Sequence, residues 1–127
     1  INDLSREVRW AGANRPLIMI DAEGKLNIYQ GNKDPIGGTQ ARPGRTFTTH
    51  VIKVEVATMA YLFTDGYADQ FGGDRGKKFM VRRLHELLAT VHSLSPDAQQ
   101  AALEAHFEEW RRHHEQVDDV LIAGIEI

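Results

Sequence analysis

The 127-residue sequence contains no cysteine, which excludes disulfides, thiolate zinc sites and a cysteine nucleophile. This absence fits a reducing compartment, and we expect the segment to be cytoplasmic. The sequence also lacks an apolar run long enough to span a bilayer, and its start has no signal pattern. We therefore expect no membrane contact by this segment, and any membrane anchor of the parent protein is expected in upstream segments.

The chain also lacks a large excess of either charge sign, since its net charge is only −3. No stripe of Lys and Arg alternates with aromatic residues, so the sequence predicts that nucleic acid is not a partner. Hydrophobic residues make up 42% and charged residues 26% of the chain, which are ordinary values for a folded domain. A chain of this length can bury a core of its own.

Hydrophobic periodicity predicts strands first, then two helices, then a final strand. A stripe of Leu84, Leu87, Leu88 and Val91 predicts a helix over 77–92, and Ser95 followed by Pro96 is typical of a second helix start. This order is typical of an α+β fold. We expect a β-meander at the start, a loop over 31–45 and strands at 8–13, 17–20, 26–29, 46–56, 57–64 and 120–127.

Acidic residues lie at the ends of two apolar runs. One run ends on Asp65-Gly66, and Asp118-Asp119 opens the second. A carboxylate at the mouth of a buried strand is costly unless a cation, hydrogen-bond donors or water receive it, and carboxylate oxygens are the ligands that Mg²⁺ and Mn²⁺ prefer. A plain turn after a strand, for Asp65-Gly66, and a solvated loop pair, for Asp118-Asp119, are the alternatives.

The two acidic positions belong to a set of four motifs along the chain. The motifs are Arg9-Trp-Ala-Gly-Ala-Asn-Arg-Pro-Leu-Ile18, Asp34-Pro-Ile-Gly-Gly38, Leu62-Phe-Thr-Asp-Gly-Tyr-Ala-Asp-Gln70 and Gln116-Val-Asp-Asp-Val-Leu-Ile122. In this order they resemble the C-terminal part of the PPM-type metal-dependent serine/threonine phosphatases, in particular the bacterial SpoIIE-like branch. Leu121 departs from the pattern, because many relatives have threonine there.

The resemblance also implies what the sequence does not contain. Family members carry an upstream Gly-Asp strand motif and an Asp-x-x-Gly-His-Gly turn, and neither occurs in these 127 residues. We therefore expect residues 1–127 to be a single partial domain, with the N-terminal strands and helices of the phosphatase domain, and a sensory region, lying upstream. The implied fold is an antiparallel β-sandwich flanked by helices. An incomplete sandwich exposes sheet edges, so we expect the fragment to form homo-oligomers.

The family pattern assigns roles to individual residues. The resemblance implies a two-metal Mn²⁺ or Mg²⁺ centre in the intact domain, in which a metal-bound water is the nucleophile and no side chain serves as one. The implied metal ligands are Asp65 and Asp118, with Gly66 and Asp119 as supporting residues. Asp69 is a further candidate supporting residue, with an ordinary loop acid as the alternative. Arg15 lies where many relatives have His-Asn, and we consider it a candidate to face the phosphate, with solvent exposure as the alternative. Gly66 is expected to let the backbone turn away close to the ion.

The implied function is that of a protein serine/threonine phosphatase in bacterial signalling. Its expected substrate is a phosphorylated regulatory protein such as an anti-sigma-factor antagonist, and the fragment alone is expected to be inactive. One alternative is a phosphatase-like interaction module that has lost catalysis, which eroded upstream metal motifs would reveal. Another is a structural α+β domain without a site, which Mn²⁺ and Mg²⁺ would not stabilise.

Overall fold

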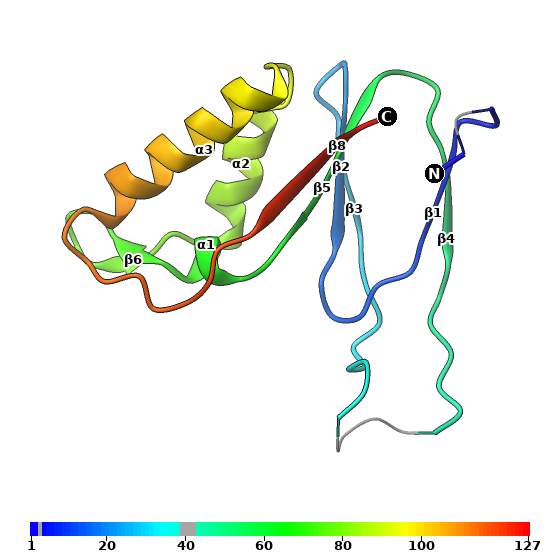
Figure 1. The fold of residues 1–127 in the computed structure, drawn as a ribbon, viewed down its shortest axis with the longest axis horizontal. Coiled ribbons are helices and arrows are strands. Elements are labelled where there is room, and N and C mark those ends of the chain that lie inside the picture. Colours follow the sequence, from blue (N-terminus) through cyan, green and yellow to red (C-terminus); the bar gives the residue numbers. More distant parts are fainter. Residues whose placement is uncertain (3, 39–42) are drawn as a thin grey trace. The chain divides into compact units, whose positions relative to one another are not determined.

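The computed structural model describes residues 1–2, 4–38 and 43–127, which form two compact units. The first unit comprises residues 1–62 and 124–127, and the second comprises residues 63–123 (Figure 1). Part of the predicted loop, residues 39–42, lies outside the described residues. The prediction that residues 1–127 form a single partial domain stays a prediction. None of the described helices is long and apolar enough to cross a membrane.

Two antiparallel sheets build the first unit. Strand β1 (Glu7–Trp10) pairs with β4 (His50–Lys53), and a four-stranded sheet has the order β3-β2-β5-β8. Its strands are β3 (Leu26–Tyr29), β2 (Leu17–Asp21), β5 (Thr58–Phe63) and β8 (Ile122–Glu126). The predicted α+β class with antiparallel sheets is therefore confirmed, whereas β4 is shorter than the strand predicted over 46–56.

The predicted β-meander is wrong for its first strand. Of the three strands predicted for the meander, β2 and β3 form a hairpin, whereas β1 pairs with β4, with Val8 opposite Ile52. Both side chains are buried in one hydrophobic cluster with residues of β2 and β5. Pairing β1 with β4 places both apolar side chains on the same inner face, which explains the choice of partner.

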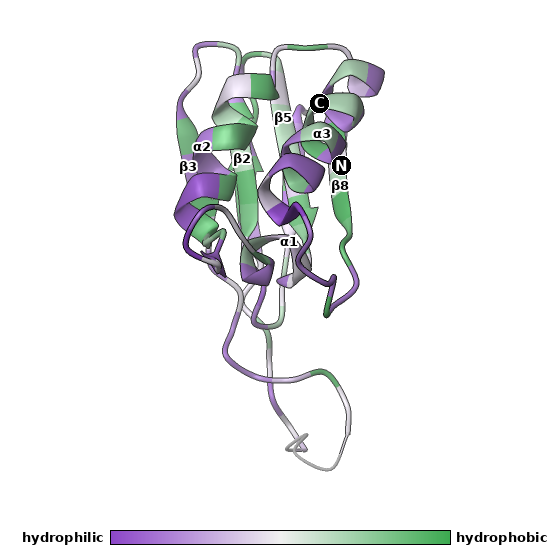
Figure 2. Ribbon diagram, turned by 90° about the vertical axis from the view of Figure 1, so that its left-hand side faces the viewer, coloured by the Kyte–Doolittle hydropathy of each residue, from purple (hydrophilic) through white to green (hydrophobic). Residues whose placement is uncertain are grey.

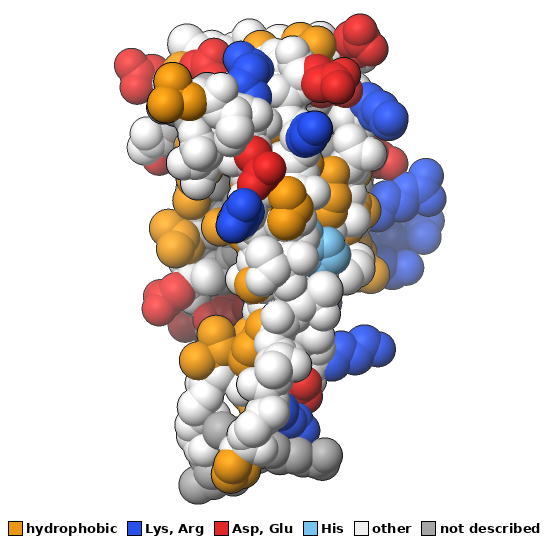
Figure 3. Space-filling view, turned by 90° about the vertical axis from the view of Figure 1, so that its right-hand side faces the viewer, with side chains coloured by type: hydrophobic (Ala, Val, Ile, Leu, Met, Phe, Trp, Pro, Cys, Tyr) orange, Lys and Arg blue, Asp and Glu red, His pale blue; other side chains and the backbone are white. Residues whose placement is uncertain are grey.

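A hydrophobic core lies between the two sheets of the first unit. It contains Val8, Leu17, Met19, Ile52, Val54 and Ala60. In β2 four successive residues are buried, so both faces of this strand are covered, and Figure 2 shows β2 and β5 as hydrophobic strands. The other side of the β1–β4 sheet is mixed: Val51 is exposed, and Arg9 pairs with Glu7. Figure 3, which faces this side, shows hydrophobic and charged side chains interspersed.

Three helices and a short hairpin form the second unit. Helix α1 (Gly66–Asp69) leads into β6 (Phe71–Gly72) and β7 (Lys77–Lys78), and α2 (Val81–Val91) and α3 (Pro96–Arg111) follow. The leucine stripe of α2 is buried as predicted, and the Oγ of Ser95 accepts a hydrogen bond from the Ala98 N–H at the start of α3. The predicted start of the first helix at Lys77 is wrong, because residues 77–78 pair with β6 instead.

Aromatic side chains make up much of the second unit's core. Tyr67 of α1 packs against Phe79 and Phe107, with ring centroids 5.2 Å and 5.0 Å away, and its hydroxyl donates to the Leu103 carbonyl at 2.8 Å. Burial raises the pKa of the Tyr67 hydroxyl. The fully buried Gln70 donates to the Glu115 carbonyl at 3.0 Å. These contacts fix α1 against α3 and against the loop that leads towards Asp118.

His85 of α2 provides a pH-dependent contribution to stability. Its Nε2 is buried and has no hydrogen-bond partner among the described residues, and its ring meets Phe63 edge-on at 6.1 Å. Burial lowers the pKa of His85 below its ordinary value of 6.5. The folded state therefore binds this proton less readily than the unfolded state, so the stabilisation is present above pH 6.5 and is lost as the pH falls through the folded-state pKa.

We accordingly expect the free energy of unfolding to fall as the pH is lowered below 6.5, and to fall less in His85→Gln. Urea unfolding followed by tryptophan fluorescence measures this difference. His106→Gln, at an exposed position of α3, is the matched control and should retain the wild-type pH dependence. Equal pH dependence in wild type and His85→Gln would contradict the assignment.

Candidate metal centre

Asp65 lies where strand β5 gives way to helix α1. It is the N-cap residue of α1, and its backbone carbonyl accepts the Asp69 N–H at 2.8 Å. Its side chain is half-buried and makes no capping hydrogen bond to the helix. The Asp65 backbone thus forms the helix start without a capping hydrogen bond from its side chain.

Thr64 connects the end of β5 to the loop that carries the second pair of acids. Its N–H donates to the Leu121 carbonyl at 3.0 Å, and its hydroxyl donates to the Asp119 carbonyl at 3.1 Å. The same hydroxyl oxygen accepts the Leu121 N–H at 3.1 Å. Leu121 contributes only backbone groups to these contacts, so the absence of threonine at this position leaves them intact. Sequence reasoning missed Thr64, although its place directly before Asp65-Gly66 was the available signal.

Gly66 allows these two segments to approach closely. A Cβ atom at this position would lie 2.2 Å from the Asp119 carbonyl oxygen and 2.8 Å from the carbonyl carbon. The expected role of Gly66, to let the backbone turn away close to a metal ion, stays a prediction, and Gly66 itself is helical and is not among the residues with positive φ. Close packing of two backbones, rather than a turn of the chain, requires glycine here. The acids at 65 and at 118–119 consequently lie on adjacent segments.

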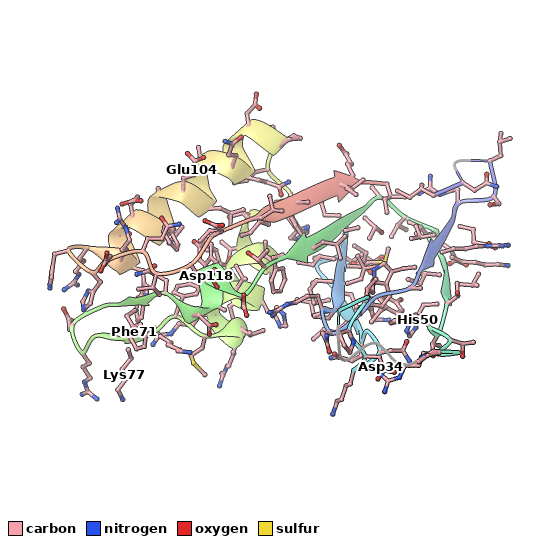
Figure 4. The ribbon with its side chains drawn as sticks, turned by 60° about the horizontal axis from the view of Figure 1, so that its bottom comes forward. Asp34, His50, Phe71, Lys77, Glu104 and Asp118 are labelled. Carbon is pink, nitrogen blue, oxygen red and sulfur yellow. The ribbon has the colours of Figure 1, made fainter. Side chains whose placement is uncertain are left out.

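Asp118 and Asp119 are both exposed on the loop before β8. An Asp118 carboxylate oxygen accepts the Asp119 N–H at 2.8 Å, and the Asp118 carbonyl accepts from the Gln116 side-chain amide at 3.0 Å. Figure 4 shows Asp118 on this loop beside helix α1. These local hydrogen bonds hold the loop and leave Asp118 at the surface next to the start of α1.

The remaining predicted site residues lie in two different places. Asp69 is in α1, and its carboxylate accepts a charge-assisted hydrogen bond from the Lys78 ammonium at 3.2 Å. Arg15 is exposed and belongs to the first unit. Roles for Asp69 as a supporting residue and for Arg15 as a phosphate-facing residue stay predictions.

Asp65 lies on one of the two adjacent segments, and Asp118 and Asp119 lie on the other. Carboxylate oxygens are of the type that Mg²⁺ and Mn²⁺ prefer. Within residues 1–2, 4–38 and 43–127, no three His, Cys, Asp or Glu side chains are clustered closely enough to hold a metal ion by themselves. Metal ligation by Asp65 and Asp118 therefore stays a prediction.

Comparison with known proteins defines the class of this fold. The chain is similar to the SiaA-PP2C domain of Pseudomonas aeruginosa, with a TM-score of 0.78 and 26% sequence identity over 94% of this chain and 45% of that one. The chain spans less than half of that structure. The chain matches the family described as Stage II sporulation protein E (SpoIIE) over residues 1–127, and it belongs to this family. No curated protein sequence matches it.

Proposed function

We propose that the protein containing this chain is a metal-dependent phosphoprotein phosphatase that hydrolyses phosphoserine or phosphothreonine. The observation that carries the proposal is the close approach of Gly66 to the Asp119 carbonyl, reinforced by the Thr64 hydrogen bonds. These contacts bring the predicted ligands onto adjacent segments. Membership of the SpoIIE family and likeness to a PP2C domain support the reaction class.

Electrostatics explains why these acids suit a cation. Two carboxylates about 4 Å apart at an effective dielectric near 20 repel each other by roughly 4 kcal/mol. Two bound Mn²⁺ or Mg²⁺ ions supply the chemistry of acidifying a water and neutralising the phosphoryl oxygens. Asp65 and Asp118 would hold these ions, while Thr64 and Gly66 fix the spacing between the two segments. In this proposal the residues of the chain bind the metal ions and fix the positions of the ligands, and no nucleophilic side chain is needed.

The proposed biological setting follows the family. We propose a cytoplasmic role in bacterial signalling, with a phosphorylated regulatory protein such as an anti-sigma-factor antagonist as substrate and an upstream sensory region in the same chain. Residues 1–127 alone are proposed to be inactive, since the chain spans 45% of the comparable PP2C structure. Self-association of the isolated fragment through its sheet edges is proposed on physical grounds, and size-exclusion chromatography measures it.

Metal dependence provides the direct test. We expect the full-length protein to hydrolyse p-nitrophenyl phosphate with Mn²⁺ or Mg²⁺ and to lose this activity on chelation with EDTA. We also expect Mn²⁺ to raise its thermal unfolding midpoint, because a ligand that binds only the native state stabilises it. Absence of both effects would favour the interaction module that lacks catalysis and would overturn the proposed reaction.

A further inference from the structure

One face of the β6–β7 hairpin exposes apolar side chains. Phe71 pairs with Lys78 across the hairpin, and the Phe79 N–H donates to the Gln70 carbonyl at 2.9 Å. Alternation along these extended segments buries Gln70 and Phe79 and leaves the neighbouring side chains exposed. Phe71 is 42% and Met80 58% exposed. Phe71, Lys78 and Met80 are called the hairpin face below.

Positively charged residues are concentrated along the hairpin and at the start of α2. Residues 71–83 contain five Arg and Lys side chains and one Asp, although the whole chain has a net charge of −3. Lys78 pairs with Asp69, Arg82 pairs with Glu86, and Arg83 lies over the Trp110 ring. The other two, Arg75 and Lys77, form no ion pair with the described part of the chain. They are therefore available to an external acid.

The hairpin face adjoins the candidate metal centre. Asp69, which binds Lys78, lies one helical turn after Asp65 and donates its N–H to the Asp65 carbonyl. Lys78 in turn lies over the Phe71 ring at 5.8 Å. Figure 4 shows Phe71 and Lys77 on the hairpin that follows α1. A polypeptide held on the hairpin face would thus pass close to Asp65.

We propose that the hairpin face docks an acidic segment of the phosphoprotein substrate. Phe71 and Met80 receive an apolar side chain, and Arg75 and Lys77 pair with carboxylates on the same segment. This proposal rests on the proposed phosphatase function and adds a substrate feature to it. A large exposed aromatic surrounded by charged groups is typical of an anchor in a protein interface.

A protein segment matches the face better than a polyanion. The acids Asp69 and Asp74 lie among the cations, and Asp74 is itself paired with Arg112. A continuous row of phosphates, as in nucleic acid or an anionic membrane, would meet these carboxylates and be repelled. Separate carboxylates on a polypeptide can avoid them, and an aliphatic side chain can cover Phe71.

Binding of labelled peptides to the full-length protein in EDTA tests the proposal without turnover. The probe is a fluorescein-labelled phosphoserine peptide flanked by Glu and Leu, and its partner probe carries Lys in place of Glu. We expect the acidic peptide to bind more tightly than the basic one, and Phe71→Ala to weaken its binding about tenfold. Arg75→Gln combined with Lys77→Gln should weaken it similarly and reduce its salt dependence.

Matched controls come from the first unit. Val51→Ala alters an exposed apolar residue of β4, and Lys33→Gln with Lys53→Gln removes two exposed lysines of the same unit. These controls should bind the acidic peptide as the wild type does. Unchanged binding in the Phe71 and Arg75/Lys77 variants would overturn the docking proposal. Stronger binding of phosphatidylserine vesicles or single-stranded DNA than of the peptide, lost in the same variants, would also overturn it.

Turnover of p-nitrophenyl phosphate separates the docking proposal from the proposed function. This small substrate has no flanking segment, so we expect Phe71→Ala to hydrolyse it at the wild-type rate while losing activity on the acidic phosphopeptide. Loss of both activities in a folded Phe71→Ala protein would contradict docking. Failure of the wild-type protein to hydrolyse any phosphoester would instead overturn the reaction, while peptide binding in EDTA would still report on the hairpin face.

Discussion

Replacing Asp65 or Asp118 by asparagine in the full-length protein is expected to lower the Mn²⁺-dependent hydrolysis of p-nitrophenyl phosphate by about 100-fold or more. The amide keeps the size of the side chain but removes the negative charge that a divalent cation requires. Both segments remain joined through Thr64 and Gly66, so the fold should survive. Steady-state rates over a range of Mn²⁺ concentrations measure the effect, and the Mn²⁺ concentration needed for half-maximal activity should rise.

A matched carboxylate elsewhere provides the control for this experiment. Glu104 is exposed on α3, as Figure 4 shows, and Glu104→Gln should keep the wild-type rate and metal requirement. Asp119→Asn and Asp69→Asn should lower the Mn²⁺-dependent rate less, by about tenfold, if these residues support the ligands rather than bind metal. Full metal-dependent activity in both Asp65→Asn and Asp118→Asn would show that the ligand assignment is wrong.

Residues with a local signature could be predicted from the sequence. The leucine stripe of α2, the Ser95-Pro96 start of α3 and the apolar strand that precedes Asp65 each have a pattern set by a few neighbouring residues. Such patterns show which face of a helix or strand packs against the core, because buried side chains recur at helical or strand spacing. The family motifs supplied the order of the acids, and the structure places the segments that carry them side by side.

Features that depend on a distant partner could not be predicted in the same way. The pairing of β1 with β4 depends on the burial of Val8 beside Ile52 in the core of the first unit. The hairpin 71–78 depends on the burial of Phe79 and Gln70 in the core of the second unit. The Lys77-Lys78 segment has a helix-compatible composition, so propensity alone extended α2 too far. Met80, whose φ is 80°, ends the extended segment before the helix begins.

The role of glycine at position 66 is the clearest case of a long-range cause. A glycine after an aspartate at a strand end is typical of a turn, and the sequence offers no sign that another backbone passes beside it. The structure places the Asp119 carbonyl, 53 residues later, where a side chain would begin. The reason for this glycine is therefore packing between the two segments that carry the predicted ligands.

This close approach predicts that Gly66→Ala is strongly disruptive. A Cβ 2.2 Å from the Asp119 carbonyl oxygen must push the two backbones apart, since neither neighbour is the end of a flexible side chain. We expect a loss of about 3 kcal/mol in stability, at the upper end of overpacking effects. The displaced loop should also lose the Thr64 hydroxyl contacts with Asp119 and Leu121. Metal-dependent activity should therefore fall even at temperatures where the protein remains folded.

Hydrogen exchange in the full-length protein measures this displacement locally. In Gly66→Ala, peptides that contain Thr64 and Leu121 should exchange faster, because each of these N–H groups is bonded across the two segments. Gly24→Ala is the matched control: Gly24 lies in the turn between β2 and β3 with φ of 83°, and a Cβ there meets nothing within 4 Å. It carries backbone strain without a clash, so it should cost about 1 kcal/mol and leave exchange at Thr64 and Leu121 unchanged. Equal exchange at these two residues in Gly66→Ala and the wild type would mean that the two segments do not depend on this contact, and the placement of Asp65 beside Asp118 would lose its main support.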